Sequence, residues 1–191
     1  MVYWDTFGPS LTDRTLNCAI NRAQELSVSH LVVASTTGQT ARRAHELMRE
    51  RKLEHTKLVV VSHHTGYREP GVNEFDPGVR EELASSGVPV LTTTHLMANI
   101  ERGMSRKFHG IYPAEIVAYT LRMFGQGTKV CIECSVMALD AGLIPFGKEI
   151  VAVAGSGRGA DSALLLKPAH AHSFFDTQIL EVICKPRILK G

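Results

Sequence analysis

Residues 35–41, with the sequence STTGQTA, are the part of this chain best suited to bind an anion. They lie between an apolar run at 31–34, typical of a buried strand, and a helical pattern over 40–52. The first N–H groups of a helix have no partner within the helix and lie at the positive end of its dipole. Four hydroxyl groups surround a glycine here, whereas a helix cap needs only one. We therefore expect a phosphate-binding loop, formed by Ser35, Thr36, Thr37, Gly38, Gln39 and Thr40.

A second glycine-rich segment, residues 155–161 with the sequence GSGRGAD, follows an apolar run at 149–154. Alternate glycines allow the backbone to turn its N–H groups toward a ligand, and an arginine adds positive charge. The expected ligand contacts are Gly155, Ser156, Gly157 and Arg158. The spacing is not GxGxxG and a strand pattern follows, which disfavours a Rossmann dinucleotide site. A flexible turn without a ligand is the alternative.

Three of the nine histidines follow expected strands. His63 and His64 come directly after the run at 57–62, and His95 follows the run at 88–91 with Thr93 close by. The sequence has no HExxH motif or other paired ligand spacing, so we expect no metal site and interpret these side chains as acid–base or ring contacts. Cys131 and Cys134 form a CxxC pair inside a helical pattern, which favours core packing over redox chemistry.

The order of the patterns predicts the fold. Expected strands at 31–34, 57–62 and 88–91 alternate with helices at 40–52 and 76–86, after a first helix at 12–26 that Thr12 or Asp13 could cap. Residues 92–112 form a partly helical excursion, and two more helices lie at 113–125 and 128–141. Short turns join the last strands, at 149–154, 162–167 and 178–185, so these should be partly antiparallel. We expect a single α/β domain over 1–191: a three-layer sandwich with a mostly parallel sheet and antiparallel strands near the C-terminus.

In such a sheet, ligands bind beyond the carboxyl ends of the strands, where the loops described above would meet. The net charge is +2 with acids and bases interspersed, which does not indicate a nucleic-acid partner. No apolar stretch reaches the length of a membrane span, and we expect a cytoplasmic protein with a small phosphate-containing ligand. Ligand-binding folds of this size often assemble, which favours a homo-oligomer.

The phosphate loop and the strand before it resemble the C-terminal α/β domain of pyruvate kinase, where an allosteric sugar bisphosphate binds. The chain looks like a stand-alone version of that domain. Together with residues 140–145 (DAGLIP) and 149–157 (EIVAVAGSG), the loop is similar to a family of uncharacterised, largely archaeal proteins with this fold. The resemblance covers nearly the whole chain and implies an open α/β sandwich that binds flavin mononucleotide (FMN), with the phosphate on residues 35–40. It does not imply kinase activity, because the barrel domain that carries pyruvate kinase chemistry is absent.

An FMN-binding protein of unknown reaction is therefore our leading expectation. Tyr67, Met97 and Phe108 are the expected apolar contacts of the ring. If the protein is an enzyme, it would be a flavin-dependent oxidoreductase, with His63, His64 or His95 as proton donor. The alternative is a non-catalytic regulatory module that binds a phosphorylated metabolite such as a sugar bisphosphate. A metal-dependent hydrolase that uses the histidine loops is a third, weaker interpretation.

Overall fold

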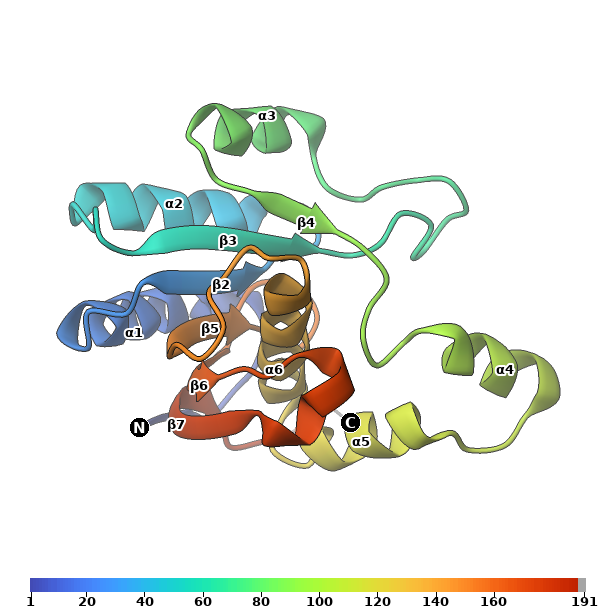
Figure 1. Ribbon diagram of the computed structural model, residues 1–191. Helices are drawn as coiled ribbons and strands as arrows, with labels where there is room; N and C mark the ends of the chain where they lie inside the picture. Colours follow the sequence, from blue (N-terminus) through green and yellow to red (C-terminus); the bar gives the residue numbers. More distant parts are fainter. Residues whose placement is uncertain (189–191) are drawn as a thin grey trace.

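A sheet of short apolar strands forms the centre of the molecule, with seven strands in residues 1–188, the part of the chain that the computed structural model describes. Their spatial order is β1-β7-β6-β5-β2-β3-β4 (Figure 1). β5, β2, β3 and β4 are parallel, as are β1 and β7, whereas β6 runs antiparallel to both β5 and β7. The strands are β1 (Val2–Trp4), β2 (His30–Ala34), β3 (Lys57–Ser62), β4 (Val90–Thr92), β5 (Ile150–Ala154), β6 (Ser162–Lys167) and β7 (Gln178–Pro186). The predicted mostly parallel sheet is confirmed.

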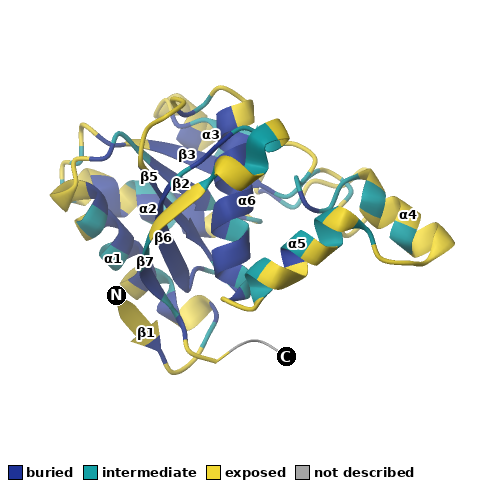
Figure 2. Ribbon diagram, turned by 60° about the horizontal axis from the view of Figure 1, so that its bottom comes forward, coloured by how far each residue is buried: buried dark blue, intermediate teal, exposed yellow. Residues whose placement is uncertain are grey.

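Helices cover both faces of this sheet, which confirms the three-layer sandwich (Figures 1 and 2). α1 (Thr12–Glu25), α2 (Gln39–Glu50) and α3 (Pro77–Ser85) pack on one face, and α6 (Gln126–Asp140) packs on the other, beside α5 (Pro113–Arg122). The described chain also contains two short 3-10 helices, η1 (Pro9–Leu11) and η2 (Ala171–Asp176). Residues 189–191 of the expected single domain lie outside the described residues.

The central strands are buried on both faces, and their side chains alternate between two hydrophobic cores. In β2, Leu31 and Val33 face the core under α1 and α2, whereas Val32 faces the core under α6. In β3, Val60 faces the core under α1 and α2, and Val61 faces the core under α6. This is why these strands read as continuous apolar runs rather than as alternating ones.

The predicted helix boundaries are correct to within a few residues, but the predicted cap of the first helix is wrong. α1 follows directly on η1, so its N-cap is Leu11 in helical geometry, without a side-chain cap. Thr12 Oγ1 instead donates to Pro9 O at 2.8 Å and accepts from Ala160 N at 3.1 Å. For α3 the prediction is confirmed, because Asp76 Oδ1 accepts the Val79 N–H at 2.9 Å.

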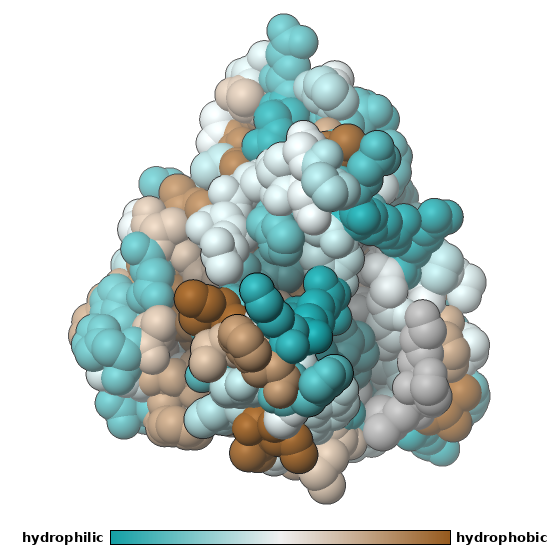
Figure 3. Space-filling view, turned by 90° about the vertical axis from the view of Figure 1, so that its right-hand side faces the viewer, coloured by the Kyte–Doolittle hydropathy of each residue, from teal (hydrophilic) through white to brown (hydrophobic). Residues whose placement is uncertain are grey.

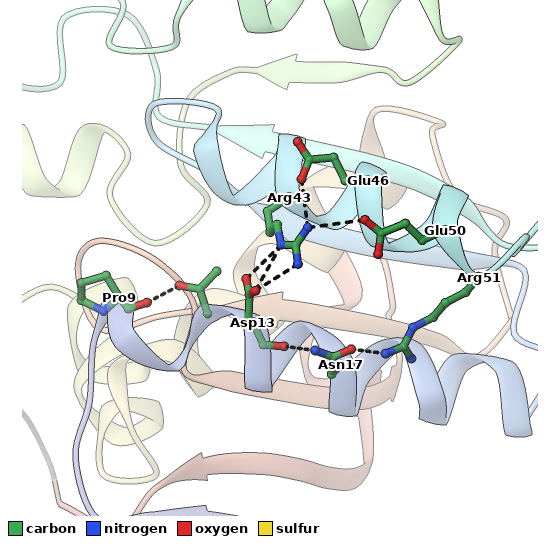
Figure 4. A network of polar contacts seen from close by, with 8 residues as sticks. Pro9, Asp13, Asn17, Arg43, Glu46, Glu50 and Arg51 are labelled. Carbon is green, nitrogen blue, oxygen red and sulfur yellow. Dashed lines mark hydrogen bonds and ion pairs between the residues drawn. The ribbon is translucent and has the colours of Figure 1, made fainter.

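A network of exposed polar contacts joins α1 to α2 (Figure 4). The guanidinium of Arg43 forms a bidentate contact with the Asp13 carboxylate, at 3.0 to 3.2 Å. It also lies 3.0 Å from Glu46 and 3.7 Å from Glu50. Arg51 donates to two asparagine side chains of α1. Exposed pairs of this kind contribute little stability singly. They link the facing sides of α1 and α2, which also share a hydrophobic core.

The excursion predicted at 92–112 contains α4 (Ile100–Phe108), and none of the residues of α4 is buried. The helix extends away from the sheet and packs against α5 (Figures 1 and 2). Ile100 and Phe108 expose 78% and 67% of their area. The face of the molecule drawn in Figure 3 carries both apolar and hydrophilic side chains. Within residues 1–188, no helix is long and apolar enough to cross a membrane.

Candidate functional site

The chain reverses its direction across the sheet between β2 and β5. After β2 it moves outward to β3 and β4, and it later returns to place β5 on the other side of β2. In an open α/β sheet, the crevice beyond the carboxyl ends of the strands at such a switch point is the usual ligand site. The phosphate loop (residues 35–41) follows β2, and the glycine loop (residues 155–161) follows β5. Both predicted loops therefore flank the same crevice.

The phosphate loop presents backbone and side-chain donors that are not used within the protein. Ser35 N donates to Val61 O at 3.0 Å, and Ser35 Oγ accepts the Ala41 N–H at 3.3 Å, so this serine fixes the loop to β3 and to the start of α2. Within residues 1–188, we find no acceptor for the N–H groups of Thr36, Thr37, Gly38, Gln39 and Thr40. The three threonine hydroxyls of this set also form no hydrogen bond with another described residue. The first turn of α2 thus supplies a set of free donors.

Gly38 sets the shape of this loop. It is the N-cap of α2 and has a φ of +95°, a backbone conformation that L side chains rarely adopt. A Cβ added here would lie 2.9 Å from Val79 Cγ1 and 3.1 Å from the Phe75 ring. The glycine is therefore required both by the turn and by the contact with α3.

Four rings gather where β3 and β4 end. The ring centroids of His63 and Tyr67 lie 3.9 Å apart, and His95 lies 5.2 Å from His63 and 5.4 Å from His64. His63 Nδ1 also lies 3.2 Å from Glu74 Oε2. We call His63, His64, Tyr67 and His95 the ring cluster. The structure thus brings together three of the predicted histidines and one of the predicted ring contacts.

Burial decides the protonation state of His95. The pKa of His95 is lowered to about 4, chiefly by loss of solvent and in addition by the neighbouring His63, His64 and Lys129, whereas Glu133 acts in the opposite direction. His95 is therefore neutral at pH 7. It can form hydrogen bonds there, but it is not suited to the predicted role of proton donor.

A buried ion pair lies behind this cluster and was missed by the sequence analysis. Lys129 and Glu133 of α6 each expose 4% of their area, and the Lys129 ammonium contacts Glu133 Oε2. Glu133 Oε1 accepts the Met97 N–H at 2.7 Å, so α6 holds the backbone just after His95. The signal was present in the sequence: two opposite charges, four residues apart, interrupt an otherwise apolar helix.

The glycine loop is mainly a structural turn. Asp161 is fully buried and its carboxylate accepts the N–H groups of Gly8 and Ser156, at 3.1 and 3.0 Å. Because the Ser156 N–H is used in this way, it is not available to a ligand. A Cβ on Gly155 would lie 2.4 Å from Gly159 O, so close backbone packing explains this glycine. Gly157 and Arg158 are exposed and are the parts of the loop that face solvent.

The remaining predicted residues divide between the site and the rest of the fold. Thr93 is exposed just beyond β4, close in sequence to the ring cluster. Met97 is buried, whereas Phe108 lies at the far end of α4, which extends away from the sheet in Figure 1. Cys131 and Cys134 are buried free thiols, and burial raises the pKa of both, which confirms core packing. In residues 1–188, no group of three or more potential ligand side chains could hold a metal ion.

Fold and site together define a three-layer α/β domain with free hydrogen-bond donors, suited to an anion, at the carboxyl edge of its sheet. A family model described as the pyruvate kinase alpha/beta domain matches residues 13–166. The chain belongs to this family, as the resemblance of the phosphate loop indicated. The matched range includes the phosphate loop, the ring cluster and the glycine loop. Membership in this family points to a ligand-binding or regulatory role.

Proposed function

We propose that this chain binds FMN at the carboxyl edge of the sheet, with the FMN phosphate on the phosphate loop. The observation that carries the proposal is the set of five successive N–H groups, from Thr36 to Thr40, for which residues 1–188 supply no acceptor. A phosphate dianion satisfies several such donors at once and lies at the positive end of the α2 dipole. The free hydroxyls of Thr36 and Thr37 add further donors.

The strength of this cradle is sufficient without a lysine. Hydrogen bonds to a charged partner contribute about 1.5–3 kcal/mol each, so three or four of them can anchor a nucleotide. Of the side chains in the loop, none is acidic, and Asp76 next to it is committed to capping α3. The local charge therefore favours an anion.

The ring cluster is well placed for the flavin end of the ligand. Neighbouring strands lie about 5 Å apart, so loops that follow β2, β3 and β4 in succession lie within about 10 Å of one another. The cluster offers aromatic faces at Tyr67 and His63 and a neutral imidazole at His95, which can form hydrogen bonds with the ring carbonyl and nitrogen atoms. Glu133 fixes the backbone that carries His95 through its bond to the Met97 N–H.

Bound FMN would supply hydride and electron transfer chemistry. The contribution of the chain is to bind and orient the ligand. A neutral His95 would lie beside the flavin ring, and Glu133 of α6 holds the segment that carries His95 through the Met97 N–H. These features support FMN binding.

The second candidate is a regulatory domain that binds a phosphorylated metabolite without chemistry. The family match favours this alternative. The phosphate loop would serve a sugar phosphate as well as a flavin, because its donors contact only the phosphate group. The ring cluster distinguishes the two, since a sugar bisphosphate gains little from aromatic faces and has a second phosphate that needs cations.

The proposal is tested by the visible spectrum of the purified protein and by titration of the stripped protein with FMN. We expect FMN to bind, and a Thr36→Ala/Thr37→Ala variant to bind it at least about tenfold more weakly because two donors to phosphate are lost. The matched control is Thr120→Ala, an exposed threonine of α5 whose hydroxyl bonds to Ile116 O. Substitution of Gly38 is less informative, because any side chain there would clash with α3.

Two results would contradict the proposal. One is a stripped protein that takes up no FMN, and the other is a double variant with the affinity of the unmodified chain. Calorimetry with a sugar bisphosphate then tests the second candidate on the same samples.

A further inference from the structure

A cavity of about 620 Å³ lies at the opposite edge of the sheet from the proposed FMN site. It is bordered by the C-terminal end of α2, the start of β3 and the turn between α3 and β4. Its apolar lining includes Met48, Leu58 and Val88, all of which are buried. The volume lies within the range of about 300–1,000 Å³ that is usual for pockets of small organic ligands.

The charged side chains around this cavity are strongly unbalanced. Arg49, Lys52 and Lys57 line it as permanent cations, and Glu54 is the one acidic residue in the lining. The chain as a whole has a net charge of only +2. Within residues 1–188, none of the three cations forms an ion pair. Three cations against a single carboxylate therefore border this cavity.

The end of α2 explains only part of this excess of positive charge. Arg49 lies in the last turn of α2, where a cation compensates the negative end of the helix dipole, and Lys52 follows that end. Lys57 has no such role, because it begins β3 and is the register partner of His30 at the start of β2. A helix end carries only about half a negative charge, which is less than the three cations supply.

The half-buried His30 lies at the edge of the cavity, next to Lys57. Burial and the neighbouring Lys57 both lower its pKa, which keeps the imidazole neutral at pH 7. Its Nδ1 lies 2.8 Å from Ser29 Oγ. His45 lines the same cavity, so ring nitrogens and ammonium groups surround the apolar lining.

We infer that this cavity is a second binding site, for a small organic anion that carries a phosphate or carboxylate group on an apolar body. The anionic group would pair with Arg49, Lys52 and Lys57, and the apolar body would cover Met48 and Val88. Because β3 has six residues, the two edges of the sheet lie about 20 Å apart. A ligand here would therefore be distinct from one on the phosphate loop.

The test uses 1-naphthyl phosphate, with 1-naphthol and inorganic phosphate as partial ligands. In a titration followed by amide ¹H–¹⁵N spectra, we expect 1-naphthyl phosphate to bind most tightly and to shift the amides of residues 45–58 and 86–89. Single Lys52→Gln and Lys57→Gln variants should bind about two- to fivefold more weakly, since each loses one partly exposed charge contact. A Lys52→Glu/Lys57→Glu variant should bind more than about tenfold more weakly, and binding should weaken with added salt.

The matched control is Lys107→Glu, which reverses an exposed lysine on α4 and should leave the affinity unchanged. The melting temperature of each variant establishes that it is folded, and the single glutamine variants still provide the test if the double variant is not. The inference is wrong if the shifts are confined to residues 35–41. It is also wrong if 1-naphthyl phosphate does not bind at millimolar concentration, or if the Lys52 and Lys57 variants bind it as the control does.

Discussion

His95 illustrates how the surroundings of one side chain set its chemistry. Its sequence position suggested a proton donor, but its half-buried place within the ring cluster disfavours the charged form. A neutral imidazole acts through hydrogen bonds, as donor at one nitrogen and acceptor at the other. If the protein is an enzyme, the proton donor is therefore to be sought elsewhere, with His63 and His64 as the remaining predicted candidates.

The low pKa of His95 predicts acid-sensitive stability. In the unfolded chain the pKa is near 6.5 and in the folded chain it is about 4, so between these values the unfolded state binds more protons. The stabilising contribution is complete above pH 6.5 and is lost as the pH falls toward 4. We expect the free energy of unfolding to fall by about 2–3 kcal/mol more between pH 7 and 4.5 in the unmodified chain than in a His95→Gln variant. Urea unfolding at the two pH values measures this difference.

The groups around His95 define the control for this experiment. His63, His64 and Lys129 oppose its protonation and Glu133 favours it, so the effect belongs to the cluster and not to histidines in general. An exposed histidine, His55, serves as the comparison. Equal pH dependence in the His95→Gln and His55→Gln variants would show that His95 is not the responsible group.

At the scale of elements, α6 does more than cover the sheet. Its Lys129–Glu133 pair lies under the segment that carries His95, and both side chains are almost fully excluded from solvent. Replacing such a pair as a whole by apolar groups is often tolerated, whereas breaking it leaves one buried charge without a partner. The pair therefore links the interior of the helix layer to the geometry of the site.

Breaking this pair should be strongly destabilising. We expect Lys129→Met and Glu133→Gln each to lower the free energy of unfolding by about 3 kcal/mol. A Lys129→Met/Glu133→Gln double variant should lose less than the sum of the two single variants, because no charge stays uncompensated. Chemical denaturation of the four proteins gives the coupling energy directly.

The exposed Arg43–Glu46 pair of α2 provides the comparison, since both side chains face water. Arg43→Met should have only a small effect, which added salt reduces further. Two results would contradict the importance of burial. One is a large fall in the free energy of unfolding of the Arg43→Met variant, and the other is a double variant of Lys129 and Glu133 whose loss equals the sum of the two single losses.

Most elements of this fold could be predicted because their signals are local. β2 and β3 are continuous apolar runs, and Asp76 followed by Pro77 marks the start of α3 without ambiguity. β1 was missed because it has three residues and exposes Val2 and Tyr3, so it lacks an apolar pattern. Its pairing with β7 joins the two ends of the chain, a contact that no local pattern contains.

The candidate site was predictable to the extent that it consists of loops at strand ends. The phosphate loop and the histidines were found from their position after apolar runs, since parallel strands place all such loops at one edge. The structural role of the glycine loop was not found, because it depends on Asp161 reaching Gly8, a contact across 153 positions. The cavity lined by Arg49, Lys52 and Lys57 was not predicted either. Its residues come from separate segments that only the folded sheet brings together.

At the scale of the whole molecule, the sheet separates two edges with different donors. The carboxyl edge offers backbone N–H groups and hydroxyls at the start of α2, whereas the opposite edge offers side-chain cations around an apolar cavity. Backbone donors are fixed by the fold and select a compact anion by geometry. Side-chain cations on flexible stems tolerate a wider range of anions. We therefore expect the carboxyl edge to be the more selective of the two.

This difference predicts how ligands change global stability. A ligand that binds only the folded chain raises the free energy of unfolding by about 2.7 kcal/mol when its concentration is 100 times its Kd. We expect FMN to produce this rise, and riboflavin, which has the same ring but no phosphate, to produce much less at the same concentration. The Thr36→Ala/Thr37→Ala variant should show a smaller difference between the two compounds, because two hydroxyl donors to the phosphate of FMN are lost while the backbone N–H groups of the loop stay in place. Equal stabilisation of the unmodified chain by FMN and riboflavin, measured by urea unfolding, would show that the phosphate loop is not what holds the ligand.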